Sequence, residues 1–183
     1  KQYGVFIAWI CFAALFHKSI LVVIPVYLFA HYLAEHKIPK WLYGVGAAFL
    51  VSLLVCKNFY RRIIFFFYPF YEGSAFDKVD ISFTNIAKCM GVLLLCIVFY
   101  KVALKENVQA KFYFFLNVAG FAVYTFASFI PEVSRIGYYM IVSQIFLVPS
   151  VLIRIENKGW RWFWTLGFAV AFLGYFGLFL HSA

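Results

Sequence analysis

The sequence predicts an all-α polytopic transmembrane bundle of about six to seven spans with one long extracytoplasmic loop. Hydrophobic residues make up 66% of the 183 positions and charged residues only 13%, both far from the values of a soluble domain with a single core. The apolar residues also form long runs separated by short basic connections. The net charge of +9 is therefore better explained by membrane orientation and anionic head groups than by nucleic acid.

Candidate spans follow from the apolar runs, since a helix needs about 20 residues to cross the hydrocarbon core. They lie at about 3–16, 19–34, 41–56, 85–104, 111–130, 136–153 and 160–180. Only His17 and Lys18 separate the first two. As one straight helix this stretch would be about 46 Å long, which exceeds a core of about 30 Å. The sequence thus predicts a break near His17, as two spans, as a re-entrant pair, or as a tilted helix kinked at Pro25.

The chain begins at Lys1 without an initiator methionine and runs directly into apolar sequence. We therefore expect residues 1–183 to be a single transmembrane domain and a fragment that lacks upstream helices. The four cysteines lie inside or at the edges of apolar runs, without CxxC spacing. We expect all of them to be small buried apolar residues rather than disulfide partners or metal ligands.

The longest stretch outside the candidate spans is KNFYRRIIFFFYPFYEGSAFDKVDISFT, residues 57–84. Its apolar run at 63–67 is too short to span, so we expect it to lie in the membrane interface or to dip into it. Glu72, Asp77 and Asp80 are expected to be solvated loop charges, because their spacing fixes no geometry.

The basic residues indicate which side of the membrane each connection occupies. With seven crossings, one side receives nine of them: Lys1, Lys37, Lys40, Lys101, Lys105, Lys111, Arg154, Lys158 and Arg161. The other side receives six: Lys18, Lys57, Arg61, Arg62, Lys78 and Arg135. The positive-inside rule places the first side in the cytoplasm. His17, the 57–84 stretch and Arg135 are then predicted to share the extracytoplasmic side.

Arg61 and Arg62 are candidates for binding a phosphate group. A guanidinium group presents a planar fork of donors that matches phosphate oxygens, and a diphosphate at the head-group level would be a natural partner. Tyr60, directly before the pair, is a candidate substrate-binding residue with them. The alternative is an interfacial aromatic anchor whose arginines bind ordinary lipid phosphates.

Arg135 is a second candidate cation. Pro131 is expected to end one helix and Ser134 to cap the next, so that Arg135 falls in its first turn. A cation there opposes the helix dipole, which favours a specific anionic partner. The alternative partners are Glu132 and lipid head groups.

His17 is the candidate base, because a histidine can accept a proton near neutral pH or donate a hydrogen bond to a phosphate or sugar hydroxyl. The alternative is a solvated turn histidine. His31 and His36 flank Glu35, but the sequence HYLAEH does not match the zinc-binding pattern HxxEH and no third ligand is evident. No metal and no cofactor are therefore expected.

Two stretches resemble the EpsG family of polytopic proteins, which is similar to the Wzy-type polymerases of bacterial exopolysaccharide, capsule and O-antigen. One is IAWICFAALFHKSILVVIPVYLF at 7–29, in which His17 and Ser19 stand between apolar runs. The other is SRIGYY at 134–139, leading into IVSQIFLVP at 141–149. Lys18 departs from the pattern, where a small or polar residue is expected. The resemblance covers the whole chain and corresponds to the middle and C-terminal parts of such a protein.

The resemblance implies a glycosyltransferase that polymerises undecaprenyl-diphosphate-linked oligosaccharide repeats at the outer face of the bacterial inner membrane. Arg135 and the Arg61/Arg62 pair would stabilise the leaving diphosphate, and His17 would orient or deprotonate the acceptor hydroxyl. Tyr138 and Tyr139 are expected to bind substrate. The expected partners are the lipid-linked oligosaccharide, membrane lipid and other polysaccharide-assembly proteins, with no nucleic acid.

Two further function classes are compatible with the sequence. One is a non-enzymatic transporter of lipid-linked oligosaccharide or another phosphorylated substrate, and the other is a scaffold subunit. The candidate spans contain no Asp or Glu, whereas ion-coupled transporters usually carry intramembrane carboxylates. The grouping of basic residues on one side disfavours a scaffold.

Overall fold

The computed structural model describes residues 2–74, 77, 81–131 and 133–182, and every regular element within them is helical. The α-helices are α1 (Tyr3–Ala14), α2 (Val23–Glu35), α3 (Lys40–Val55), α4 (Lys57–Phe67), α5 (Phe83–Val98), α6 (Val108–Phe126), α7 (Val133–Ile141), α8 (Gln144–Leu152) and α9 (Lys158–Ser182). Shorter elements are the 3₁₀ turns η1 (Lys18–Val22) and η2 (Pro69–Tyr71) and the π-helical turn η3 (Tyr100–Leu104). The predicted all-α class is confirmed.

The first two helices form an antiparallel hairpin. Near its open end the ring of Tyr3 lies 5.6 Å from the ring of His31, and further along Phe6 stacks on Tyr27 at 5.8 Å. The chain turns after α1, where His17 adopts an extended conformation with φ −150° and caps η1. The predicted break near His17 is therefore confirmed, and His17 lies at the tip of the hairpin.

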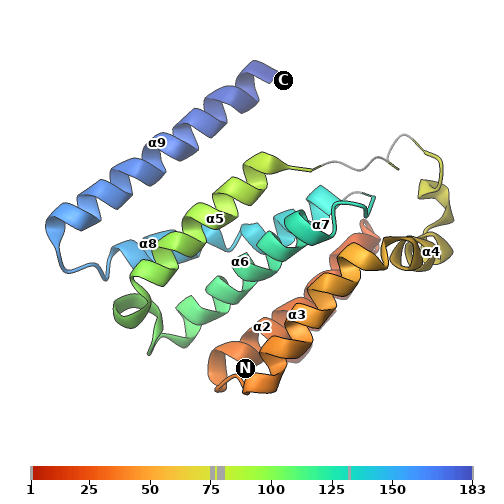
Figure 1. Cartoon of the computed structure of the whole chain (residues 1–183), viewed down its shortest axis with the longest axis horizontal. Coiled ribbons are helices and arrows are strands. Elements are labelled where there is room, and N and C mark those ends of the chain that lie inside the picture. The colour runs from red at the N-terminus through yellow and green to blue at the C-terminus, as the bar shows by residue number, and fades with distance from the viewer. Residues whose placement is uncertain (1, 75–76, 78–80, 132, 183) are drawn as a thin grey trace.

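The central helix is α6, which contacts α2, α5, α7 and α8 (Figure 1). On one side Leu116 packs with Ala30 of α2 and Met140 of α7. On the other side Ala110 belongs to a larger core shared with α5, η3 and α8, in which Leu95 and Leu147 are fully buried. The first cluster thus holds α2 and α7 against α6, and the second holds α5, η3 and α8 against it.

Two glycines allow α6 and α7 to approach closely. A Cβ atom at Gly137 would lie 2.3 Å from Cζ of Tyr124, and one at Gly120 would lie 2.7 Å from Cγ2 of Ile141. Small residues bring helix backbones together in membrane proteins, where packing rather than the hydrophobic effect drives association. This contact fixes the first turn of α7, which carries Arg135.

A buried polar cluster connects α5, α6 and α8. The amide of Asn117, which is fully buried, donates to the carbonyl of Cys89 at 3.2 Å. Gln144 donates through Nε2 to Oδ1 of Asn117 at 2.7 Å. Hydrogen bonds between helices satisfy polar groups that a lipid environment would leave unpaired, so this cluster fixes the register of the three helices.

The predicted 57–84 loop is wrong in its first part, because residues Lys57–Phe67 form α4. The reason is an amphipathic pattern that a search for spans does not detect: Lys57, Asn58, Arg61 and Arg62 lie on one face and Phe59, Ile63 and Phe66 on the other. α4 makes an angle of 82° with α3 (Figure 1). Pro69 disfavours helix at the residue before it, and the helix ends there.

The predicted spans are confirmed only in part. By length and hydropathy two stretches of the described chain can cross a membrane, Lys18–Glu35 and Val133–Leu152, with α3–α4 a third if the bent pair is one span. The predicted span at 85–104 is divided into α5 and η3. The predicted span at 136–153 corresponds to Val133–Leu152, in which only residues 142 and 143 separate α7 from α8.

The surface is typical of a membrane protein. Large apolar side chains are exposed along the outer faces of α1, α3, α5 and α9, among them Trp9, Phe49 and Phe163. Cys89 and Cys96 are buried as predicted. The prediction is wrong for Cys11 and Cys56, which are exposed because they lie on outer faces of the bundle.

Candidate functional site

A cavity of about 400 Å³ lies at the end of the bundle where η1, the end of α4 and the connection between α6 and α7 meet. These three segments are far apart in the sequence, and the prediction placed all of them on one side of the membrane. The lining residues are His17, Lys18, Ser19, Leu21, Val22, Ile64, Tyr68, Phe70, Tyr71, Ile130, Pro131 and Ile136. The cavity therefore combines polar groups of the hairpin tip with an aromatic wall and an apolar floor.

His17 is half-buried in this wall and is held there by the hairpin turn. Two residues further on, the hydroxyl of Ser19 lies 3.4 Å from the hydroxyl of Tyr139 in α7. Tyr27 donates a hydrogen bond to the backbone carbonyl of Tyr139 at 2.8 Å. These two bonds fix η1 and α2 against α7, and with them the position of the imidazole.

The aromatic wall comes from the segment after α4. Tyr68 and Tyr71 are half-buried, with ring centroids 6.2 Å apart, and Phe70 lies 4.3 Å from Tyr71. Aromatic faces beside polar groups can stack on sugar rings or on apolar chains. The wall therefore offers a surface for either part of a lipid-linked sugar.

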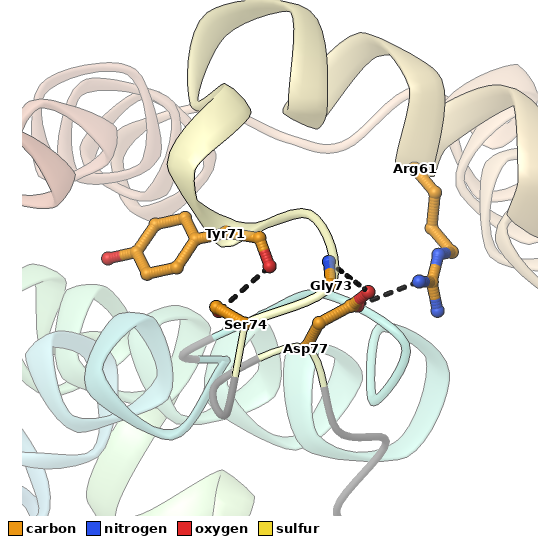
Figure 2. A network of polar contacts seen from close by, with 5 residues as sticks. All are labelled: Arg61, Tyr71, Gly73, Ser74 and Asp77. Atoms are coloured by element: carbon orange, nitrogen blue, oxygen red, sulfur yellow. Dashed lines mark hydrogen bonds and ion pairs between the residues drawn. The ribbon is translucent and has the colours of Figure 1, made fainter.

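An ion pair holds the turn behind this wall (Figure 2). Arg61 donates through Nη2 to Oδ1 of Asp77 at 2.7 Å, and the backbone N–H of Gly73 donates to Oδ2 at 3.3 Å. Gly73 has φ +69°, which glycine adopts without strain. The guanidinium of Arg61 also lies over the ring of Phe65, 5.2 Å from its centroid. The prediction that Asp77 is a solvated charge is therefore wrong.

The two arginines of α4 differ in their surroundings. Arg61 is half-buried in the pair with Asp77, whereas Arg62 is exposed. Both follow Tyr60, whose hydroxyl is hydrogen-bonded at 2.8 Å to Ser52 of α3. The structure thus leaves Arg62 as the arginine of this pair that an external phosphate can reach most directly.

Arg135 is exposed and lies in the first turn of α7, as predicted. The predicted boundaries around it are wrong. α6 ends at Phe126, several residues before Pro131, and Ser134 lies within α7 rather than before it. Tyr124 fixes this turn by donating to the carbonyl of Ser134 at 3.1 Å. Glu132, the alternative partner of Arg135, lies outside the described residues.

Neighbouring residues of α7 serve different cavities. Ile136 lines the His17 cavity, and Tyr139 contacts the hairpin behind it. Tyr138 instead lines a separate cavity next to α5 and α9. Of the predicted site residues, the structure therefore places His17 in the cavity wall, Tyr139 in contact with Ser19 of that wall, and Tyr138 in the other cavity. Arg135 directly precedes Ile136 in the chain.

An apolar groove of about 490 Å³ adjoins the His17 cavity between α2, α3 and α6. The two spaces share three lining residues, Val22, Ile130 and Ile136. The rest of the groove is lined by aliphatic and phenylalanine side chains such as Phe49 and Phe115. The sequence shows no pattern for this groove, because its residues come from separate helices that are apolar throughout.

Several members of the site could not be recognised from the sequence. Val22, Ile130 and Ile136 belong to apolar runs in the sequence, yet they form the junction of cavity and groove. Lys88, which lies near the start of the candidate span at 85–104, lines the separate cavity with Tyr138. A cation inside a candidate span was the one available signal for that second space.

A comparison with protein-family models matches the EpsG family over residues 1–183. The chain matches no curated protein and no solved structure.

Proposed function

The chain belongs to the EpsG family, a family of Wzy-like polymerases, and on this premise we propose that it polymerises undecaprenyl-diphosphate-linked oligosaccharide repeats for exopolysaccharide or capsule. It is a membrane protein of a family associated with polysaccharide polymerase activity. Beyond this family-level activity, we propose a substrate, a reaction and the residues that perform it.

The observation that supports this proposal most strongly is the junction between the His17 cavity and the apolar groove. A lipid-linked oligosaccharide has a long apolar tail, a diphosphate and a polar glycan. The groove between α2, α3 and α6 suits the tail, and the cavity with His17, Ser19 and the tyrosines suits the diphosphate and first sugars. Val22, Ile130 and Ile136 would then lie at the boundary between tail and head group.

In the proposed reaction, the hydroxyl oxygen of the acceptor sugar attacks the anomeric carbon of the donor chain. The bond from that carbon to the diphosphate oxygen breaks, and the carrier leaves as polyprenyl diphosphate with the bonding electrons. His17 orients the acceptor hydroxyl and accepts its proton. Substrate contacts are proposed for Tyr60, Tyr138 and Tyr139, and the hydroxyl of Tyr60 is held by its hydrogen bond to Ser52.

Arg135 and Arg62 are the proposed partners of the leaving diphosphate, since negative charge grows on it as the bond breaks. Both are exposed, Arg135 one residue before Ile136 and Arg62 two residues before Ile64, and these two isoleucines line the cavity. Arg61 is proposed to contribute less to binding the diphosphate, because its guanidinium group is already paired with Asp77. A diphosphate that competes for Arg61 would loosen this turn.

The proposed topology has six to seven crossings, with the cavity on the extracytoplasmic side of the bacterial inner membrane. In Figure 1 the starts of α3, α6 and α9 lie toward one end of the bundle, and α4 and the start of α7 toward the other. Exposed Trp41, Trp160 and Trp162 lie in the first turns of α3 and α9, at the proposed cytoplasmic interface. α4 would lie along the opposite interface.

Reconstitution tests the reaction. The full-length protein is placed in liposomes with purified lipid-linked repeats, and the glycans and free carrier are measured. We expect longer lipid-linked glycans, with one polyprenyl diphosphate released for each repeat added. Binding of the repeats with no change in glycan length would contradict polymerisation and support the transporter instead.

A further inference from the structure

A second cavity, of about 560 Å³, lies between α5, α7, α8 and α9. It is separate from the His17 cavity, because α7 presents Ile136 to one and Tyr138 to the other. Of the residues assigned a role in the reaction described above, only Tyr138 lines this space. One end of this cavity is lined by polar side chains and the other end mainly by apolar ones.

The polar end is formed by Lys88, Tyr138 and Tyr175. The ammonium of Lys88 lies 3.8 Å from the centroid of the Tyr175 ring. Among the described residues no carboxylate lies within 4.0 Å of this ammonium, and neither tyrosine hydroxyl makes a hydrogen bond. A cation inside a membrane helix is costly unless it is paired, so this end of the cavity favours an anion.

The apolar end lies deeper in the bundle. α5 and α9 run antiparallel, since Phe99 meets Trp164 at one end and Lys88 meets Tyr175 at the other. Phe168 lines the cavity about 10 Å along α9 from Tyr175, and Val148 lines it from α8. A ligand that fills this space needs an anionic head and an apolar chain.

We propose that this cavity binds a phosphate-bearing amphiphile, with the phosphate on Lys88 and the chain along Ile145, Val148 and Phe168. The proposal rests on the proposed function, because a polymerase must hold two lipid-linked molecules at once, the donor chain and the incoming repeat. The His17 cavity and the Lys88 cavity lie against the same helix, whose first turn carries Arg135. The Lys88 cavity holds the second of these two lipids.

The test uses a polyprenyl phosphate with a photoreactive diazirine in its chain, added to the full-length protein in phosphatidylcholine nanodiscs. Cross-linked peptides are identified by mass spectrometry. We expect labelling of α8 and α9, reduced about tenfold in Lys88→Met and kept in Lys88→Arg, since a charged hydrogen bond is lost only in the first. Lys101→Met, which removes an exposed lysine of η3, serves as the matched control and leaves labelling unchanged.

Ile145→Trp provides a second variant, because Ile145 lines the cavity but is 67% exposed and is not required for packing. We expect the larger side chain to block the chain site and remove labelling of α8 and α9. Equal labelling of the wild type, Lys88→Met and Ile145→Trp would overturn the proposal.

A competition experiment distinguishes a polyprenyl phosphate from a bulk phospholipid as the ligand of this cavity. Labelling that persists in excess phosphatidylglycerol supports a polyprenyl lipid, whereas displacement by an equal amount of phosphatidylglycerol identifies a site for bulk lipid and overturns the second-substrate role. Labelling of the α2–α3–α6 groove without the Lys88 cavity refutes only this inference. Absence of labelling at both sites would refute the substrate class of the proposed function as well.

Discussion

His17 lies where backbone and side-chain contacts restrict its movement. It follows the last turn of α1 in an extended conformation, and Ser19 ties the next turn to Tyr139. A base must stay within hydrogen-bond reach of the hydroxyl that it deprotonates, so this restraint is a requirement of the proposed role.

Replacement of His17 by Gln tests the proton transfer. Glutamine keeps a hydrogen-bond donor but cannot accept a proton near neutral pH, so we expect the polymerisation rate to fall about hundredfold with little change in substrate binding. The rate is measured in the liposome assay. His36→Gln is the matched control, since His36 is exposed at the end of α2 and bonds its own helix at Tyr32. Equal activity of the two variants would remove His17 from the mechanism.

Arg135 occupies a position where the helix dipole disfavours a cation. We expect Arg135→Ala to reduce polymer formation about hundredfold or more with normal membrane insertion, and Arg135→Lys to recover only part of it, because lysine cannot form a bidentate contact. Polymer length on gels and protein level in membranes are measured together. Arg154→Ala, at an exposed arginine that bonds the carbonyl of Ser150, should retain activity. Wild-type polymer from Arg135→Ala would exclude it as a phosphate ligand.

The sequence predicts the positions of some site residues but not their interaction partners. The break near His17 and the first-turn position of Arg135 could be predicted, because local sequence determines both. The partner of Arg61 could not, since Asp77 lies 16 residues away across a turn whose shape depends on Gly73. The sequence therefore identified the cations but not which of them is already paired.

At the scale of elements, the contact between α6 and α7 sets the position of the site. Gly120 and Gly137 lie on two different helices, and each leaves room for a large side chain of the other helix. From the sequence they were two glycines among eleven, with no signal that they face each other. α4 was missed for a related reason, since an amphipathic helix at an interface lacks the continuous apolar run of a span.

Gly137→Ala should destabilise the protein and displace the first turn of α7. The added Cβ would lie 2.3 Å from Cζ of Tyr124, and overpacking of this kind costs about 1 to 3 kcal/mol. We expect a lower thermal unfolding temperature in detergent, measured by intrinsic fluorescence, together with reduced polymerisation. Gly167→Ala in α9 is the control, because a Cβ there meets nothing within 4 Å and alanine favours helix. A higher unfolding temperature for Gly137→Ala would contradict the close contact.

For the whole molecule, the sequence predicted the helical class and the order of apolar segments because hydropathy and helix length carry that information. It did not predict the break at η3 or the one between α7 and α8, since both depend on tertiary contacts: Ala103 and Leu104 of η3 are buried in the core, and Gln144 at the start of α8 bonds Asn117 of α6. The number of crossings stays a prediction, because α1 and α5 have only 12 and 16 residues. Sidedness can be measured independently of that number.

The side of the membrane on which the cavity lies decides whether it can meet its proposed substrate. A variant without the four native cysteines is given one cysteine, either at Arg62 on α4 or at Lys158 at the start of α9. Since the positive-inside count places Lys158 in the cytoplasm, we expect a membrane-impermeant maleimide to label position 62 in intact spheroplasts and position 158 only after permeabilisation. Labelling is read as a mass shift on gels. The reverse pattern would place Arg62 and the His17 cavity in the cytoplasm, where the acceptor repeats proposed here do not reach them.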